Sequence, residues 1–223
     1  MKPLSLRVYV ITTTVPELGR THEDITSAAI VGGADVIQFR DKETLDDEFE
    51  ATARRLLTLC RSKGVPLIIN DRVEIAAKIG ADGVHVGHED FVIDRSRIRQ
   101  LRQMWGTKRN TKDPIIGVSA RNLDEALALS TCGADYLGVG PIFATGSKAD
   151  ASEPIGTNEL RRICRAVTIP VVAIGGITAD NLPQVIQAGA TGAAVIAVVA
   201  QASDMKLATE TLQAAWKRST TKA

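Results

Sequence analysis

A loop past the middle of the chain combines the residue types that a phosphate group needs. The stretch Asp135–Lys148 (DYLGVGPIFATGSK) begins with a short apolar run and passes through a Gly-Pro pair into Thr145, Ser147 and Lys148. Hydroxyl and backbone donors together with a cation, placed directly after a strand, are suited to phosphate binding. The alternative is an ordinary solvated loop, because Ser, Thr and Gly are common loop residues. The stretch is not a Walker A loop, which requires GxxxxGK followed by Ser or Thr.

Carboxylates occur after two other apolar runs. Asn70-Asp71 ends one run, and Asp90 follows the next. Hard oxygen donors of this kind suit Mg²⁺, which is typically held by one or two carboxylates plus substrate phosphate. Helix capping is the alternative for each Asp taken alone. Because Arg40, Lys42 and Lys148 also follow apolar runs, the pattern favours a site for Mg²⁺ and a diphosphate.

A second phosphate site is predicted further along the chain. Gly175-Gly176 ends the seventh apolar run, and Ile196-Ala197 ends the eighth. Glycine lets the backbone approach an oxyanion closely, and many barrels bind a phosphate through N–H groups at these two places. We therefore expect a monoanionic ligand there.

Histidine chemistry receives little support from the sequence. His85 and His88 have the HxxH spacing, but no third nitrogen or sulfur ligand is near, so zinc is not expected. We predict that His85 is a core residue and that His88 lies at the mouth of the site and contacts substrate. No Ser-His-Asp arrangement or GxSxG motif supports acyl transfer.

The elements that must position these residues form a regular series. Helix-like segments with apolar residues at three- and four-residue spacing separate the apolar runs, for example Leu45–Cys60, Arg95–Met104, Leu123–Cys132 and Leu182–Ala188. The runs themselves are short and rich in β-branched residues: Arg7–Thr13, Val36–Arg40, Pro66–Asn70, Gly83–Val86, Ile115–Ser119, Tyr136–Val139, Pro170–Ile174 and Ala193–Ile196. Eight strand–helix units predict a parallel sheet, and near-continuous apolar runs indicate strands covered on both faces.

This series favours an α/β fold with one closed (β/α)8 TIM barrel domain over residues 1–223. A doubly wound open sheet usually has fewer strands, and its dinucleotide-binding form needs GxGxxG at the first turn, where this chain has Thr12-Thr13-Thr14. Gly-Ala-Asp or Gly-Ala-Thr precedes the second, fourth, sixth and eighth runs, which suggests a weak repeat of two units. The basic segment Gly106–Asp113 falls at the helix-to-strand side and is interpreted as a solvated surface.

Composition limits the possible partners and compartment. The chain has 223 residues with 27 Lys plus Arg against 26 Asp plus Glu, so no strong field attracts nucleic acid or an anionic membrane. No run approaches the length of a membrane span, and the N-terminus reads as a strand rather than a signal peptide. Cys60, Cys132 and Cys164 are far apart in stretches that read as helix, which fits a reducing cytoplasm. Whether the chain forms a homo-oligomer stays open.

With these residues in view, the chain resembles the thiamine phosphate synthase family over almost its full length. The motifs occur in a fixed order: YVITT, VIQFRDK, LIINDRVEIAAKIGADGVHVGHED, IGVSARNLDEA, GADYLGVGPIFATGSKADA, IPVVAIGGITADN and AGATGAAVIAVV. The resemblance implies a transferase that joins 4-amino-2-methyl-5-hydroxymethylpyrimidine diphosphate to 4-methyl-5-(2-phosphoethyl)thiazole. It also implies release of pyrophosphate and a requirement for Mg²⁺.

The resemblance assigns roles to residues of this chain. It places Asp71 and Asp90 as metal ligands. It assigns catalysis to Arg40, Lys42, Ser119 and Lys148. The residues assigned to substrate binding are Gln38, Arg40, Lys42, Asn70, Ser119, Thr145, Ser147, Lys148, Gly176, Ile196 and Ala197. The implied mechanism is dissociative, because an aminopyrimidine delocalises positive charge at its methylene while cations neutralise the departing pyrophosphate.

Departures from the family pattern and two rival functions limit these assignments. His88 replaces a usual Gln, Ala144 a common Pro and Ala197 a common Ser, which loosens the argument about substrate shape. A related barrel, thiazole tautomerase, uses a histidine after the fifth strand, where this chain has Ala120-Arg121. A non-catalytic binder of thiamine-pathway phosphates is the other rival, and it would release no pyrophosphate.

Overall fold

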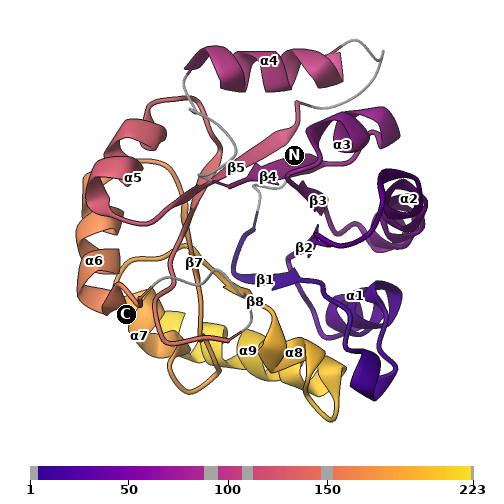
Figure 1. Ribbon diagram of the computed structural model, residues 1–223. Helices are drawn as coiled ribbons and strands as arrows, with labels where there is room; N and C mark the ends of the chain where they lie inside the picture. Colours follow the sequence, from indigo (N-terminus) through magenta and orange to yellow (C-terminus); the bar gives the residue numbers. More distant parts are fainter. Residues whose placement is uncertain (1–4, 88–94, 107–112, 147–152, 222–223) are drawn as a thin grey trace.

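Eight parallel strands close into a barrel in chain order (Figure 1). The computed structural model describes residues 5–87, 95–106, 113–146 and 153–221. The strands are β1 (Val8–Ile11), β2 (Val36–Phe39), β3 (Leu67–Asn70), β4 (Gly83–Val86), β5 (Ile115–Ala120), β6 (Tyr136–Val139), β7 (Val171–Ile174) and β8 (Gly192–Val195). Each strand pairs in parallel with its neighbours in sequence, and β8 pairs with β1 to complete the ring. The predicted (β/α)8 barrel is therefore confirmed.

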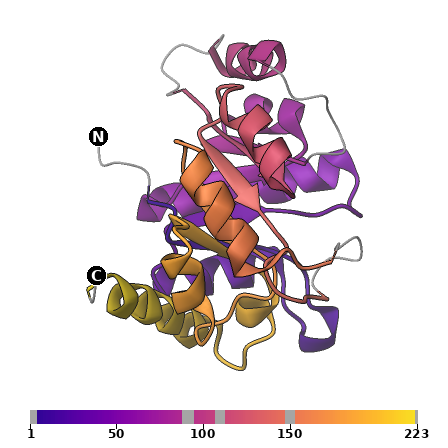
Figure 2. The same ribbon diagram turned by 90° about the vertical axis from the view of Figure 1, so that its left-hand side faces the viewer.

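Helices surround the barrel and alternate with its strands (Figure 1). They are the 3-10 turn η1 (Pro16–Leu18), α1 (His22–Val31), α2 (Asp46–Lys63), α3 (Val73–Ile79), α4 (Arg95–Gly106), α5 (Leu123–Ser130), α6 (Gly156–Ala166), α7 (Leu182–Gln187), α8 (Ala197–Ala200) and α9 (Met205–Thr220). Figure 2 shows α6 crossing in front of the barrel. Within the described part of the chain, no helix has the length and apolar character needed to cross a membrane.

The helix predicted over Leu123–Cys132 ends two residues early. Helix α5 stops at Ser130, and Cys132 lies in the turn that follows, so its assignment to a helix was wrong. The hydroxyls of Ser130 and Thr131 donate hydrogen bonds back to carbonyls three residues earlier, at 2.8 and 3.1 Å. Side-chain bonds of this kind compete with the regular helical ladder and favour its termination.

The two faces of each strand bury different sets of side chains. Residues such as Val10, Ile37 and Ile69 point outward and pack against the helices in the larger core. Residues such as Tyr9, Val36 and Ile68 point inward and fill the barrel. This alternation follows from the period of two in a strand, so every second residue near a strand's carboxyl end faces the barrel interior.

The Gly-Ala-Asp segments fasten the amino-terminal end of the barrel. In each, the Asp carboxylate accepts a hydrogen bond from a backbone N–H in the first two residues of the preceding strand. The three pairs are Asp35 with Val8 (3.0 Å), Asp82 with Leu67 (3.0 Å) and Asp135 with Ile116 (2.7 Å). Since a backbone N–H at the start of a strand would otherwise need another acceptor, these carboxylates satisfy it locally.

The corresponding segment before β8 has Thr191 in place of Asp. The Thr191 hydroxyl donates a hydrogen bond to the Val171 carbonyl at 3.0 Å. Burial alone would raise the pKa of Asp35, but hydrogen bonds from Ser5, Val8, Arg7 and Gln213 lower it below its usual value. The repeat that the sequence suggested therefore has a structural role.

Side-chain hydrogen bonds join the first and last parts of the chain. The Arg20 guanidinium donates to the Ala200 carbonyl at 2.6 Å, across 180 residues of sequence. The Gln213 amide donates to Asp35 at 2.8 Å, across 178 residues. Helices α1 and α9 pack against each other, so the barrel is closed by helix contacts as well as by the β1–β8 pairing.

Candidate functional site

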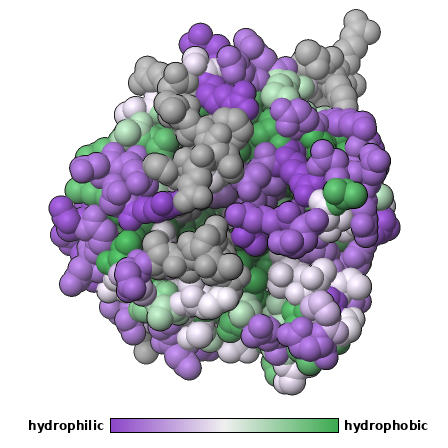
Figure 3. Space-filling view, in the orientation of Figure 1, coloured by the Kyte–Doolittle hydropathy of each residue, from purple (hydrophilic) through white to green (hydrophobic). Residues whose placement is uncertain are grey.

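A cavity of about 580 Å³ lies at the carboxyl ends of the strands. Its size falls within the usual range for small-molecule sites. The predicted site residues that the structure describes all line it: Gln38, Arg40, Lys42, Asn70, Asp71, Ser119, Thr145, Gly176, Ile196 and Ala197. Predicted residues Asp90, Ser147 and Lys148 lie outside the described residues, as does His88. In Figure 3, hydrophilic residues dominate the face seen along the barrel, and hydrophobic ones show in hollows between them.

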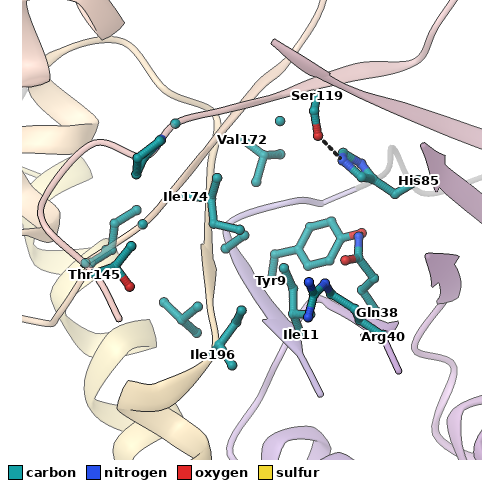
Figure 4. Close-up of a pocket in the computed structure, with 18 of the residues that line it drawn as sticks. Tyr9, Ile11, Gln38, Arg40, His85, Ser119, Thr145, Val172, Ile174 and Ile196 are labelled. Carbon is teal, nitrogen blue, oxygen red and sulfur yellow. Dashed lines mark hydrogen bonds between the residues drawn. The ribbon is translucent and has the colours of Figure 1, made fainter. Parts of the chain in front are cut away.

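The end of β2 sends alternate side chains into the cavity. Gln38 and Arg40 face inward and lie close together beside Tyr9 in Figure 4, whereas Phe39 packs outward in the core. The loop that follows is held by Asp41, whose carboxylate accepts bonds from the Glu43 and Thr44 amides at 3.0 and 3.1 Å. A fixed loop keeps the neighbouring Lys42 at the cavity edge, so Arg40 and Lys42 bring two positive charges to the cavity.

Asp71 is held in an unusual backbone conformation at the end of β3. Its φ of 60° is the single positive value among the described non-glycine residues. Its carboxylate accepts bonds from the Gly87 amide at 3.2 Å and from the Asn70 side chain at 2.5 Å. Arg72, without a side-chain capping bond, is the N-cap of α3, so the capping alternative for Asp71 is wrong. Strained backbone of this kind is common at functional sites.

The loop after β6 is hydrogen-bonded to the end of β7. The backbone N–H groups of Ile142 and Phe143 donate to the carbonyls of Ile174 and Gly175, at 2.9 and 3.1 Å. A Cβ atom added to Gly176 would lie 2.5 Å from the Ala144 carbonyl oxygen and 2.8 Å from the Phe143 Cβ. The missing side chain of Gly176 therefore makes room for this loop, which carries Thr145.

The end of β8 turns directly into a short helix at the cavity wall. Ile196 is the N-cap of α8, and Ala197 is its first residue. The first N–H groups of a helix have no partner within the helix, so they are available to a ligand. The Gly175-Gly176 turn follows β7, the strand that pairs with β8, and lines the same cavity.

A chain of hydrogen bonds crosses the floor of the cavity. The Gln38 amide nitrogen lies 2.9 Å from the Tyr9 hydroxyl, which lies 2.8 Å from the Tyr136 hydroxyl. That hydroxyl is 3.0 Å from His85 Nδ1, and His85 Nε2 is 2.9 Å from the Ser119 hydroxyl (Figure 4). Burial raises the pKa of both tyrosines well above the usual value, so both phenols stay protonated.

The prediction that His85 is a core residue was wrong. His85 is half-buried at the cavity wall, because β4 places it inward beside Gly117 of β5. Sequence reasoning also missed Tyr9 and Tyr136, the only tyrosines in the chain. The alternation of inward and outward residues along a strand could have revealed them, because each tyrosine lies two residues from another inward position. A buried phenol also needs a hydrogen-bond partner.

Metal donors are sparse in the described part of the chain. No group of three His, Cys, Asp or Glu side chains there is placed to hold a metal ion. Asp71 with the neighbouring Asn70 gives one carboxylate and one amide at the cavity. This donor set fits Mg²⁺, which keeps several waters and needs only one or two carboxylates beside a substrate phosphate.

The closed barrel and its cavity define a (β/α)8-barrel protein whose ligand site lies at the end where such barrels carry their active sites. Comparison with known proteins identifies the family. Residues 8–199 match the family model described as thiamine monophosphate synthase. The chain therefore belongs to that family, and the resemblance seen in the motifs is confirmed.

Curated relatives and a solved structure agree with this assignment. The chain is 47% identical to the thiamine-phosphate synthase of Chloroflexus aurantiacus over 208 residues, which cover 93% of this chain and 91% of the relative. It is 48% identical to that of Geobacillus thermodenitrificans over 200 residues, covering 88% and 86%. The solved thiamine phosphate pyrophosphorylase from Pyrococcus furiosus superposes with a TM-score of 0.81 at 36% identity, covering 96% of each chain.

Proposed function

We propose that this protein is a thiamine phosphate synthase. It is a transferase that joins 4-amino-2-methyl-5-hydroxymethylpyrimidine diphosphate to 4-methyl-5-(2-phosphoethyl)thiazole and releases pyrophosphate. The observation that carries the proposal is the grouping of the described site residues around one cavity, in a chain that belongs to the thiamine monophosphate synthase family. The three separate thiols are consistent with a reducing cytoplasm as the place of the reaction.

The two ends of the cavity suit different parts of the substrates. We assign the diphosphate to the side of Arg40, Lys42 and Asp71, because that side carries the cations and the carboxylate. We also assign Lys148, further along the loop after β6, to the diphosphate, whereas Thr145 lies nearer Ile174 and Ile196 than Arg40 in Figure 4. We assign the thiazole phosphate to the backbone N–H groups around Gly176, Ile196 and Ala197, where uncharged donors suit a single phosphate.

Departure of pyrophosphate is the step that these side chains would assist. As the bond from the methylene carbon to the diphosphate oxygen breaks, the electron pair leaves with pyrophosphate and positive charge spreads into the aminopyrimidine. Arg40, Lys42 and Lys148 stabilise the leaving group, and the thiazole nitrogen then forms the new bond to the methylene carbon. No protein base is needed, because the nitrogen carries no proton to remove.

Mg²⁺ fits the Asp71 side of this site, with Asp90 as the second proposed ligand. When bound, Mg²⁺ supplies further neutralisation of the pyrophosphate charge. Asn70 keeps the Asp71 carboxylate in place through the 2.5 Å hydrogen bond, and the Gly87 amide holds its other oxygen.

One assay tests the proposal against both rivals. The purified protein is incubated with both substrates and Mg²⁺, and thiamine phosphate and pyrophosphate are measured. A non-catalytic binder releases no pyrophosphate, and a tautomerase forms no thiamine phosphate. We expect Arg40→Ala and Asp71→Ala each to reduce turnover at least about a hundredfold, as loss of one preorganised charge contact typically does. Arg54→Ala is the matched control, because Arg54 pairs with Glu50 on the outer surface of α2. Full turnover in excess EDTA would refute the metal assignment.

A further inference from the structure

The hydrogen-bonded chain on the cavity floor joins residues from five strands: Gln38 of β2, Tyr9 of β1, Tyr136 of β6, His85 of β4 and Ser119 of β5. Two glycines give it space. A Cβ on Gly117 would lie 2.1 Å from the Tyr136 ring, and a Cβ on Gly138 would lie 2.9 Å from the His85 ring. Any larger residue at these positions would displace the rings, so the two glycines leave the space that the Tyr136 and His85 rings occupy.

The donor and the acceptor in each hydrogen bond of this chain can be deduced from its buried end, at Gln38 and Tyr9. The Gln38 amide nitrogen can only donate, so the Tyr9 oxygen accepts from it. Tyr9 is 1% exposed, and its second neighbour is the Tyr136 hydroxyl. If Tyr136 also donated to Tyr9, the Tyr9 hydrogen would lack an acceptor among the partners that the described residues give it. A buried unsatisfied donor is costly, so Tyr9 donates to Tyr136.

The same reasoning continues to the cavity. Tyr136 accepts from Tyr9 and therefore donates to His85 Nδ1. A neutral imidazole that accepts at Nδ1 carries its hydrogen on Nε2, so His85 donates to the Ser119 oxygen. The Ser119 hydrogen then has to point elsewhere, and Ser119 lines the cavity.

We infer that Tyr9, Tyr136 and His85 are positioning residues that fix His85 as its Nε2–H tautomer and turn the Ser119 hydroxyl into a hydrogen-bond donor aimed into the cavity. A serine hydroxyl ordinarily rotates to suit its neighbours, and here the chain removes that freedom before a ligand binds. Ser119 thereby selects an acceptor atom of the ligand. This last step rests on the proposed function, in which the acceptor is a ring nitrogen of the aminopyrimidine. The exocyclic amino group of the aminopyrimidine is a donor, so it cannot accept the Ser119 hydrogen.

The tautomer can be measured without any substrate. In ¹⁵N-labelled, ligand-free protein at pH 8, long-range ¹H–¹⁵N spectra distinguish a protonated from an unprotonated ring nitrogen, and the His85→Gln spectrum assigns the signals. We expect His85 to have hydrogen on Nε2 and a bare Nδ1. The opposite tautomer, or an equal mixture, would overturn the inference.

A single isosteric substitution should reverse the direction of every hydrogen bond between residue 38 and Ser119. In Gln38→Glu the carboxylate accepts from Tyr9, so each bond turns round, His85 takes its hydrogen on Nδ1 and Ser119 donates to Nε2. We expect the ¹⁵N pattern of His85 to exchange between its two nitrogens. An unchanged pattern would show that Gln38 does not set the direction and would refute the proposed chain.

Kinetics test whether His85 acts through Ser119. We expect Ser119→Ala and His85→Leu each to lower kcat at least about tenfold, and the double variant to be no worse than the poorer single one, because both remove the same oriented donor. His85→Gln retains an N–H that can reach Ser119 and should recover much of the loss. Multiplied effects in the double variant, or no recovery with Gln, would contradict the positioning role. Absence of any synthase turnover in the unaltered protein would refute the proposed function, while the ¹⁵N measurement would still decide the tautomer.

Discussion

Gly176→Ala is expected to damage the protein well beyond the loss of glycine's backbone freedom. Gly176 has φ 63°, a region that costs an L-residue about 1–2 kcal/mol. The new methyl group would also meet the Ala144 carbonyl oxygen at 2.5 Å and the Phe143 Cβ at 2.8 Å. Real Cβ atoms do not sit at such distances, so the loop after β6 must shift.

The magnitude follows from these two parts. Overpacking of a well-packed site typically costs about 1–3 kcal/mol, so the total loss in free energy of unfolding is about 2–5 kcal/mol. Gly64→Ala is a matched control, because Gly64 has φ 69° at the end of α2 and a Cβ there has nothing within 4 Å. Gly64→Ala should lose only the backbone part, about 1–2 kcal/mol.

Urea unfolding of the three proteins measures the difference. Titration of each substrate then shows where the shifted loop acts. The loop continues into Lys148, which we assign to the diphosphate, and Gly176 is on the turn that we assign to the thiazole phosphate, so we expect weaker binding of both substrates. Equal stability losses in Gly176→Ala and Gly64→Ala would refute the steric reasoning. Damage to thiazole phosphate binding alone would show that Gly176 serves only the phosphate.

Three further predictions concern stability and reactivity. Asp82→Ala leaves the first N–H of β3 without its carboxylate acceptor and should lower the free energy of unfolding by about 1–3 kcal/mol in urea titrations, whereas Asp82→Asn retains an oxygen acceptor and should lose less. Burial lowers the pKa of His22 below 6.5, so below that pH the unfolded chain binds a proton that the folded protein does not. The free energy of unfolding should therefore fall as the pH decreases from 6.5, by up to about 1.4 kcal/mol per pH unit. His22→Asn should flatten this slope in urea titrations between pH 6.5 and 5. Burial raises the pKa of Cys60 to about 12, so a thiol reagent at pH 8 should modify Cys60 far more slowly in the native protein than in urea; equal rates would contradict its burial.

The strands were the most predictable part of the fold. Short β-branched runs bounded by Gly, Asp and Pro gave all eight strands to within a few residues, because strands buried on both faces leave an unmistakable apolar pattern. Helix ends were less predictable, as α5 shows, since hydroxyl groups at Ser130 and Thr131 compete with the helix in a way that apolar spacing does not record.

The charged residues predicted for the site line the cavity where the structure describes them, but the neutral hydrogen-bonded residues of the cavity floor were missed. Arg40, Lys42 and Asp71 stand out in sequence because charged side chains are rarely buried within strands and so mark the strand ends, and these three line the cavity. Tyr9 and Tyr136 do not stand out, because an aromatic residue within an apolar run reads as core. Their role depends on contacts between strands that are remote in sequence, which only the closed barrel brings together.

Closure of the barrel between β1 and β8 constrains when the protein can finish folding. Val8 pairs with Ala193, roughly 185 residues later, and the Arg20 and Gln213 contacts span similar separations. At typical ribosomal rates, β8 is synthesised roughly 10 to 40 s after β1. During that interval the inward face of β1, including Tyr9, has no β8 beside it. One edge of β1 therefore stays unpaired on the nascent chain until β8 is made, and an unpaired edge can pair with another chain.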